Sequence, residues 1–211
     1  VAVHQRPAWR RRRSILLGSV ARYCLPVTAY LTNQFLIAMP AMDDPNFAQT
    51  VTLVCEHSER GALGIVINRT LPMTLGEVFQ QLDLDCTRSR VSDQPVLRGG
   101  PVQTERGFVL HSPAGNYESS LPFSERMHLT TSRDILDALA AGEGPGNAVI
   151  ALGYAGWEAG QLEDEMARNA WLSVDADERV LFATPIEQRW SAAARLLGID
   201  LLALSSDAGH A

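Results

Sequence analysis

The alternation of short β-branched runs with glycine-containing turns is the feature that most limits the folds open to this chain. The clearest pair is VTLVCEH, residues 51–57, and GALGIVINR, residues 61–69, which a short polar connection joins. Runs rich in valine and isoleucine on either side of such a turn are typical of a hairpin or of two adjacent strands in a buried sheet. The two segments are therefore predicted to lie side by side.

Apolar runs predict further strands along the rest of the chain. They are NQFLIAMP at 33–40, PVLRGGPVQTERGFVLHSP at 95–113, MHLTTS at 127–132, GNAVIALGYAG at 146–156, AWLSVDAD at 170–177 and RVLFAT at 179–184. The Gly-Gly-Pro corner within residues 95–113 predicts a second hairpin, and the last two segments predict a final strand pair. DDPNFAQT at 43–50 has the composition of a polar turn or a single helical turn.

Helices are predicted where capping residues precede amphipathic segments. Thr74 opens TLGEVFQQLDL with a glutamate three residues further on, which is the pattern of a capping box. Ser132 is expected to cap a helix that stops at Gly142. The strand that contains GYAGW is expected to run directly into a helix over about 157–168, and a last helix is predicted over 185–198.

These elements predict an α+β fold. Hairpins outnumber β-α-β crossovers, which favours a mixed, largely antiparallel sheet flanked by helices over a doubly wound parallel sheet. The chain has 211 residues, of which 46% are hydrophobic, so it can bury one sizeable core. No long linker divides it, and we expect a single compact domain over residues 31–211.

Residues 1–30 differ in composition from the remainder. Four arginines, Arg10–Arg13, precede a short apolar run, which is the outline of a signal peptide. The apolar run is short and is interrupted by Arg22, so the favoured interpretation is a disordered basic leader, with export as the alternative. No other segment has the length of a membrane span. A cytoplasmic location without membrane association is therefore expected.

Charge and cysteine content argue against several classes of function. The formal net charge is -6, so direct DNA binding would need a local basic patch, and we expect none. The three cysteines, Cys24, Cys55 and Cys86, form neither a disulfide framework nor a metal-binding spacing. This usage is typical of a reducing cytoplasm. No metal or cofactor is expected.

Several long motifs occur in an order that resembles the YqgE/AlgH family, also called UPF0301, of bacterial proteins. The motifs are NQFLIAMPAMDDPNFAQTVTLVCEHSERGALGIVINR, LRGGPV, GYAGWEAGQLEDEMARNAWL and RVLFATPIEQRW, and the resemblance covers about residues 31–204. It implies a compact α+β fold with a complex sheet. One member was named for a regulatory role in alginate production, and no enzymatic activity is established for the family. Thr70 and Leu71 precede Pro72 where the family tends to place proline directly after Asn68 and Arg69, so this loop departs from the family pattern.

Two glycine-rich corners are the candidate ligand sites. Bare backbone N–H groups, an arginine and aromatic edges could bind an anion there, provided that the two corners lie close together. The candidate residues are Arg69, Arg98, Gly99, Gly100, Gly153, Tyr154, Gly156 and Trp157. The alternative, which we favour for residues 153–157, is a structural corner in which glycine allows close packing and the aromatic rings fill the core.

No catalytic constellation is apparent in the sequence. Cys55 and His57 would share one face of a regular strand, yet their spacing is too long for a hydrogen bond, and a core cysteine is the favoured interpretation. His111 and His128 are expected to be structural. Two functions remain open: a non-enzymatic regulatory module that binds an unknown protein partner, or a small-ligand or anion-binding sensor or enzyme that uses the corners at 99–101 and 153–157.

Overall fold

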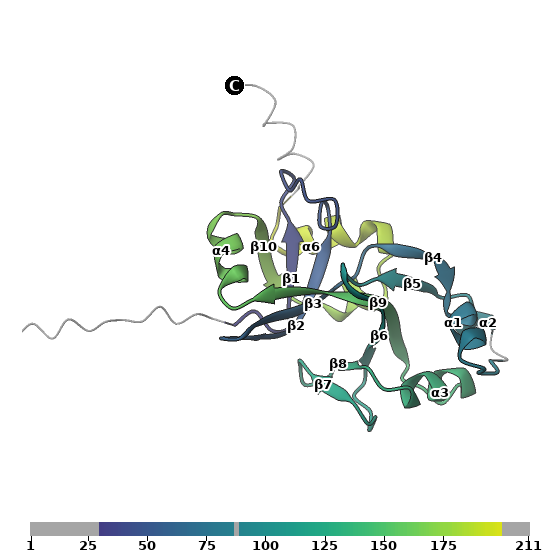
Figure 1. Ribbon diagram of the computed structural model, residues 1–211. Coiled ribbons are helices and arrows are strands. Elements are labelled where there is room, and N and C mark those ends of the chain that lie inside the picture. Colours follow the sequence, from purple (N-terminus) through teal and green to yellow (C-terminus); the bar gives the residue numbers. More distant parts are fainter. Residues whose placement is uncertain (1–29, 87–88, 200–211) are drawn as a thin grey trace, which may run out of the picture.

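The computed structural model describes residues 30–86 and 89–199 (Figure 1). The basic leader predicted for residues 1–30 therefore lies outside the described residues except for Tyr30, and so does the end of the chain from residue 200.

A curled sheet forms the body of the molecule. Its strands follow the order β10-β1-β2-β3-β9-β6-β8-β7, and β5 attaches to β9 and carries β4 on its other side. The strands are β1 Gln34–Ala38, β2 Val51–Ser58, β3 Gly61–Val66, β4 Thr70–Thr74, β5 Pro95–Arg98, β6 Val102–Ser112, β7 Ser120–Pro122, β8 His128–Thr130, β9 Asn147–Glu158 and β10 Trp171–Asp175. The β5–β9 pair is parallel and the other pairings of the described strands are antiparallel. The predicted α+β class with a mixed, largely antiparallel sheet is confirmed.

Short helices pack on both faces of this sheet (Figure 1). They are α1 Leu75–Gln81, α2 Ser89–Ser92, α3 Asp134–Ala141, α4 Gln161–Ala167, α5 Glu178–Phe182, the 3-10 helix η1 Ile186–Gln188, and α6 Arg189–Leu196. The capping box of α1 is confirmed, because the Thr74 hydroxyl accepts from the Glu77 N–H and the Glu77 carboxylate accepts from the Thr74 N–H. Ser132 does not cap α3. Its hydroxyl instead donates to the Asp134 carboxylate and accepts from the Ser119 N–H.

The predicted pairing of residues 51–57 with residues 61–69 is confirmed by the β2–β3 hairpin. Its register shifts between Val54 and Glu56, which makes Cys55 the extra residue of a β-bulge. Cys55 keeps the alternation of Val51 and Leu53 and packs in the same core cluster as Phe35, whereas after the bulge His57 faces α4. The expectation that the two side chains share one face is therefore wrong.

The hairpin predicted over residues 95–113 is also wrong, because β9 lies between its two arms. Leu97 of β5 and Phe108 of β6 both stand opposite Ala151, on its two sides. The Gly99 N–H donates to the Leu152 carbonyl at 2.8 Å, so the glycine corner passes over β9 instead of closing a turn. A central strand that comes later in the chain cannot be inferred from local turn chemistry.

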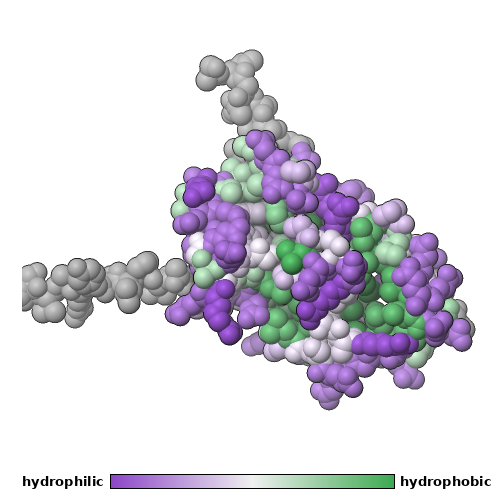
Figure 2. All heavy atoms as spheres, viewed as in Figure 1, coloured by the Kyte–Doolittle hydropathy of each residue, from purple (hydrophilic) through white to green (hydrophobic). Residues whose placement is uncertain are grey.

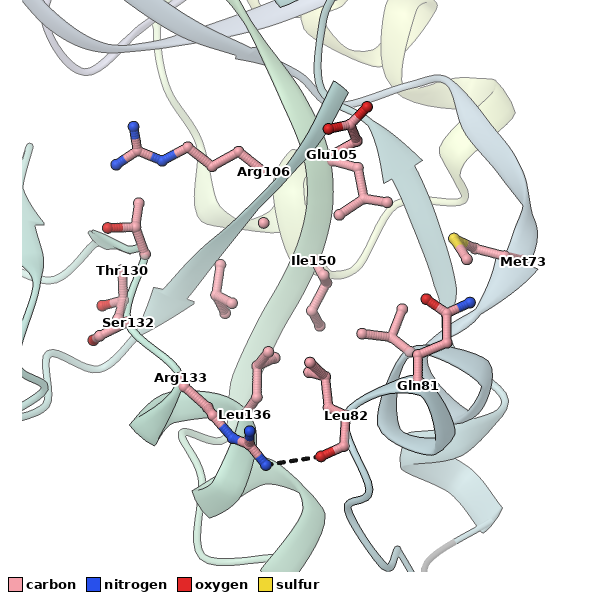
Figure 3. A pocket seen from close by; sticks show the side chains of 15 residues that line it. Met73, Gln81, Leu82, Glu105, Arg106, Thr130, Ser132, Arg133, Leu136 and Ile150 are labelled. Carbon is pink, nitrogen blue, oxygen red and sulfur yellow. Dashed lines mark hydrogen bonds between the residues drawn. The ribbon is translucent and has the colours of Figure 1, made fainter. Parts of the chain in front are cut away.

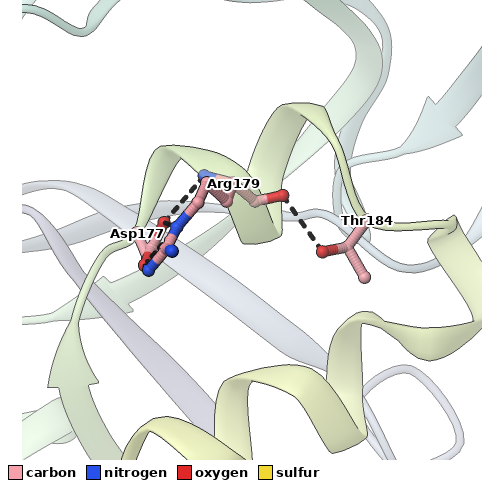
Figure 4. A network of polar contacts seen from close by, with 3 residues as sticks. All are labelled: Asp177, Arg179 and Thr184. Atoms are coloured by element: carbon pink, nitrogen blue, oxygen red, sulfur yellow. Dashed lines mark hydrogen bonds and ion pairs between the residues drawn. The ribbon is translucent and has the colours of Figure 1, made fainter.

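Residues 179–184 are predicted as a strand, but residues 179–182 lie in helix α5 instead and residues 183–184 follow its end. The Asp177 carboxylate accepts from the Arg179 N–H at 2.8 Å and also binds the Arg179 guanidinium, while the Thr184 hydroxyl donates to the Arg179 carbonyl (Figure 4). These contacts satisfy both ends of a short helix. The β10 strand, left without the predicted partner, pairs with β1.

Three clusters of buried side chains form the core. The central cluster includes Phe35, Leu53, Phe108, Leu110 and Leu181; the α3-side cluster includes Leu75, Phe79, Val109, Ile135 and Ile150; the α4-side cluster includes Leu36, Val54, Trp157, Leu162 and Trp171. The central cluster lies on one face of the sheet, and the other two lie on the opposite face. Strand β9 contributes to all three clusters.

Gly153 allows β9 to contribute side chains to all three clusters. Ile150 packs in the α3-side cluster and Ala151 in the central one, yet Tyr154, an even-numbered residue like Ile150, packs against the central cluster. Regular alternation would place it on the other face. Gly153 has a φ of 76°, and a Cβ atom there would lie 2.6 Å from the Gly100 carbonyl oxygen. The backbone kink that shifts the alternation therefore requires glycine.

The prediction that residues 153–157 form a corner leading into a helix is consequently wrong. The strand continues to Glu158, and α4 begins at Gln161. Trp157 is 6% exposed, and its indole N–H donates to Glu165 at 2.9 Å. The two aromatic residues of GYAGW thus lie within a strand.

Candidate binding site

An apolar groove of about 300 Å³ opens between α1 and α3 (Figure 3). Its lining residues are Met73, Val78, Gln81, Leu82, Glu105, Arg106, Gly107, Val109, Thr130, Thr131, Ser132, Arg133, Leu136, Ile150 and Leu152. The volume falls at the lower end of the range of small-molecule pockets. Figure 2 shows apolar side chains exposed in this part of the molecule, between hydrophilic residues.

The groove exists because two short helices cover the sheet incompletely. Val109 of β6 and Ile150 of β9 form the floor, since alternate residues of both strands face the α3-side cluster. Helix α1 supplies one wall and α3 the other. Both helices are too short to meet over this floor, and partly buried side chains such as Val78 and Leu136 remain in contact with solvent.

One hydrogen bond crosses the end of the groove. The Arg133 guanidinium donates to the Leu82 carbonyl at 2.8 Å, which ties the start of α3 to the end of α1 (Figure 3). The same guanidinium lies 3.4 Å from the Asp137 carboxylate. Both groups of this ion pair are largely exposed, so the pair orients Arg133 without adding much stability.

A bulge in β6 forms the other end of the groove. Val102 pairs with Tyr154 and Gly107 pairs with Leu152, so the residues 103–106 stand opposite Gly153 alone. These bulge residues are exposed, and Glu105 and Arg106 line the groove. The Arg106 guanidinium lies 5.4 Å from the Phe108 ring centroid and donates to the Gln103 side-chain oxygen at 3.3 Å. Bulges of this kind frequently direct side chains at binding sites.

A second hollow lies on the opposite face of the sheet. Its apolar lining includes Leu63, Phe108, Leu121, Leu129 and Tyr154, which belong to or pack against the central cluster. Its polar lining includes Glu118 and Ser119. Arg106 and Thr131 line both the hollow and the groove, so the two cavities meet at these residues.

The structure brings the two predicted glycine corners together. A Cβ atom on Gly99 would lie 2.2 Å from the Gly153 carbonyl oxygen, and one on Gly100 would lie 2.1 Å from the Tyr154 carbonyl carbon. The backbones are in direct contact there, and the Gly99 N–H is already bonded to Leu152. The glycines are therefore needed for this crossing of two strands. Binding of an anion there stays a prediction.

The other predicted ligand residues surround this crossing. The Arg98 N–H donates to the Arg69 carbonyl at 2.9 Å, so the two arginines are neighbours, and both are exposed. The Arg69 guanidinium donates to the Ala48 carbonyl at 2.6 Å. Tyr154 and Gly156 line a shallow hollow with Trp157 beside the β2–β3 turn. Neither arginine lines that hollow or the groove.

The thiol and imidazole groups have structural partners. Cys55 is 1% exposed, and burial raises the pKa of its thiol well above the usual range. The His57 Nδ1 atom accepts from the Leu31 N–H at 2.9 Å, so Nε2 carries the proton and donates to the Glu163 carboxylate at 3.0 Å. The prediction of a core cysteine is confirmed.

His111 lies fully buried at the edge of the α3-side cluster. Its Nδ1 atom lies 3.1 Å from the Pro113 carbonyl, to which it donates, and its Nε2 atom accepts from the Thr130 hydroxyl at 2.8 Å. Burial lowers the pKa of this imidazole. The His128 ring centroid lies 5.8 Å from that of His111, with the two rings tilted by 59°, and the buried Nδ1 atom of His128 has no hydrogen-bond partner among the described residues.

Within residues 30–86 and 89–199, no three histidine, cysteine or carboxylate side chains cluster closely enough to hold a metal ion. The same ranges contain no helix of sufficient length and hydropathy to cross a bilayer.

The groove was not predicted from the sequence. Its walls and rim include Gly107, Thr131, Arg133 and Leu136, and none of these lies in a recognisable motif. The one available signal was QTER at 103–106, a polar insertion within an apolar strand pattern, which is consistent with a bulge.

Comparison with known proteins identifies the family. The AlgH-like family model matches residues 35–202. A UPF0301 protein of Thioalkalivibrio sulfidiphilus is 56% identical over 187 residues, which cover 89% of this chain and 100% of that protein. A UPF0301 protein of Cupriavidus metallidurans is 57% identical over 181 residues, or 86% of this chain and 95% of that protein.

Solved structures agree with this assignment. The solution structure of the AlgH protein from Pseudomonas aeruginosa matches with a TM-score of 0.72 at 53% identity, and covers 87% of this chain and 97% of that one. A crystal structure from Corynebacterium diphtheriae matches with a TM-score of 0.66 at 19% identity, covering 81% and 89%, and shows a shared fold alone. The chain therefore belongs to the AlgH-like family, UPF0301.

Proposed function

We propose that this chain is a non-enzymatic regulatory protein that binds a protein partner through the groove between α1 and α3. The observation that carries the proposal is an apolar groove in which Val78, Leu136 and Leu152 stay partly exposed above the buried floor residues Val109 and Ile150, with polar residues at its ends. Apolar surface that stays exposed in a folded protein commonly marks an interaction site. The proposed setting is the cytoplasm, and the proposed binding unit is the whole region 31–211 acting as one domain.

The alternative of a ligand sensor built on the glycine corners has weaker support. At the crossing of Gly99 and Gly153 the two backbones touch, and the Gly99 N–H is engaged by Leu152. An anion would have to compete with these contacts. The groove offers open apolar surface without such competition, so the protein-binding function is preferred.

Gly107 permits a test that closes the groove from within. This residue lines the groove, and a Cβ atom added to it would meet no atom within 4 Å. A Gly107→Leu side chain should therefore fill part of the groove while leaving the fold intact. Gly146 is exposed, and its Cβ position is also free, so Gly146→Leu is the matched control.

The partner can be captured by photo-crosslinking in living cells. A crosslinking residue at Leu136, in the groove, should capture one partner protein, whereas the same residue at the exposed Leu197 of the α6 end should not. Binding of the purified partner should weaken by about tenfold or more in Gly107→Leu and stay unchanged in Gly146→Leu. Equal crosslinking at both positions, or full binding by Gly107→Leu, would reject the groove as the site.

A further inference from the structure

One edge of β6 has no neighbouring strand beside the groove. The register of β6 with β8 runs from His111 opposite His128 to Val109 opposite Thr130 and ends there. Beyond it, the Thr131 N–H donates to the Ser119 carbonyl at 2.9 Å, and the chain turns away into α3. Strand β6 continues in the other direction to Val102. Among the described residues, no strand pairs with β6 on that side ahead of Val109.

We define residues 104–108 as the open edge of β6. Gly107 and Phe108 are held in place by pairing with Leu152 and Ala151 of β9 on the other side. The edge at Gly107 and Phe108 is therefore positioned by β9, whereas residues 104–106 belong to the bulge. Backbone groups on such an edge can pair with an additional strand.

The two cavities flank this open edge on opposite faces of the sheet. The groove, with Val109 and Leu136, lies on one face, and the hollow, with Phe108 and Leu121, lies on the other. In an extended strand, successive side chains point to opposite faces. A strand laid along the open edge, in line with β8, would place alternate side chains in the groove and in the hollow. A helix or a small molecule would use one cavity and leave the other empty.

The charge at the place where the groove and the hollow meet defines the chemistry of a strand bound along the open edge. The Arg106 guanidinium lies where the two cavities meet, and its hydrogen bond goes to the neutral Gln103 amide. No carboxylate of the described residues forms an ion pair with it. Glu105 lines the groove and Glu118 lines the hollow. An acidic residue of a bound strand is therefore favoured only beside Arg106.

We propose that the partner binds as an extended peptide segment that adds a strand to residues 104–108 of β6, with apolar side chains alternating into the groove and the hollow and an acidic residue facing Arg106. The inference rests on the proposed function and specifies the partner's conformation and chemistry. Backbone pairing would supply affinity, and the two cavities would supply sequence preference.

The test uses peptides selected against the full chain from a random linear library displayed on phage. Enriched peptides should carry apolar residues at alternate positions and an acidic residue between them. On binding, the amide hydrogens of residues 104–108 should exchange more slowly. N-methylation of alternate peptide residues should abolish binding, because it removes the backbone donors that face β6.

Two charge variants sharpen the result. Arg106→Glu should weaken binding of the selected acidic peptide by about tenfold or more, since a close opposite charge becomes a like charge. Arg60→Glu is the matched control, because Arg60 is also exposed and lines the separate hollow beside the β2–β3 turn. It should bind the peptide as well as the unmodified chain does.

Three outcomes would overturn strand addition. They are the absence of any enriched peptide, binding of peptides as helices, and protection of α1 and α3 amides without protection of residues 104–108. If crosslinking at Leu136 still captured a partner in any of these cases, the proposed protein-binding function would stand while the extended conformation was rejected.

Discussion

The two regions of the sheet differ in how completely helices cover them. In the region of β10, β1, β2 and β3, helix α4 packs on one face and helices α5 and α6 pack on the other. We call this the closed region. In the region of β4, β5, β6 and β8, helices α1 and α3 cover their face only in part and leave the groove between them. We call this the open region.

This difference separates stability from binding. The closed region packs its part of the sheet between helices on both faces, and the Trp157 and Trp171 indoles both donate to Glu165. In the open region, apolar side chains such as Val78 and Leu136 are only partly buried and line the groove, where a partner can reach them. Binding surfaces commonly lie in the less completely packed parts of a fold. Substitutions should therefore affect stability mainly in the closed region and binding mainly in the open one.

The strongest test of this comparison is Gly100→Ala, because it affects the strand crossing that both regions share. A Cβ atom there would lie 2.1 Å from the Tyr154 carbonyl carbon, and the φ of 156° already disfavours a side chain. We expect the unfolding free energy to fall by about 3 kcal/mol or more, measured by urea denaturation. Both regions should lose stability together. Gly146→Ala, whose Cβ is free, should change it by less than about 0.5 kcal/mol.

Glu165→Ala tests the closed region alone. The carboxylate accepts from the Trp157 and Trp171 indoles at 2.9 and 2.8 Å, and from the Gln161 amide at 2.9 Å. Hydrogen bonds to a charged group contribute more than neutral ones, so we expect a loss of about 2–3 kcal/mol in denaturation experiments and a change in tryptophan fluorescence. The exposed neighbour Asp164→Ala is the control. An equal effect in both variants would contradict the role of Glu165.

Cys55→Ser tests the packing of the closed region, because it replaces one buried sulfur atom by a hydroxyl oxygen. The thiol is 1% exposed, so the hydroxyl of serine would be buried at a cost of about 1–3 kcal/mol. In a chain whose other cysteines are replaced, native Cys55 should react with a thiol reagent only as fast as the protein unfolds. Rapid labelling at neutral pH would show that this part of the closed region opens readily.

A change of pH is expected to have a smaller effect on the unfolding free energy, through His111 of the open region. Burial holds the pKa of folded His111 below its ordinary value of 6.5, whereas the unfolded chain binds that proton near pH 6.5. The unfolded state therefore binds more protons as the pH falls below about 6.5, and the unfolding free energy decreases until the pH passes below the folded pKa. Urea titrations at several pH values should show this slope, and His111→Gln should reduce it. Equal slopes in both proteins would exclude His111 as its source.

Local signals predicted the elements whose stability is local. The Thr74 capping box and the β2–β3 hairpin depend on residues that are close in sequence, and both were predicted correctly. Helix α5 was missed because valine, leucine and phenylalanine at 180–182 have the composition of a strand, while the Asp177 cap decides the outcome.

Elements that depend on distant partners could not be predicted in this way. Leu97 and Phe108 are separated by β9, which comes later in the chain, so the turn between them gave the wrong pairing. The groove has the same origin. Its floor joins Val109 to Ile150, and its walls come from α1 and α3, so no single segment of the sequence carries its pattern.

The place of β9 in the sheet has a consequence for the rate of folding. This strand pairs with β3, β5 and β6, and its partner residues range from Gly61 to Ser112, all far earlier in the chain. Such pairings require large loops to close before any contact offsets the entropy lost, which slows folding. The chain must be synthesised past Glu158 before its sheet can form, so until then the edges of the earlier strands stay exposed to other chains.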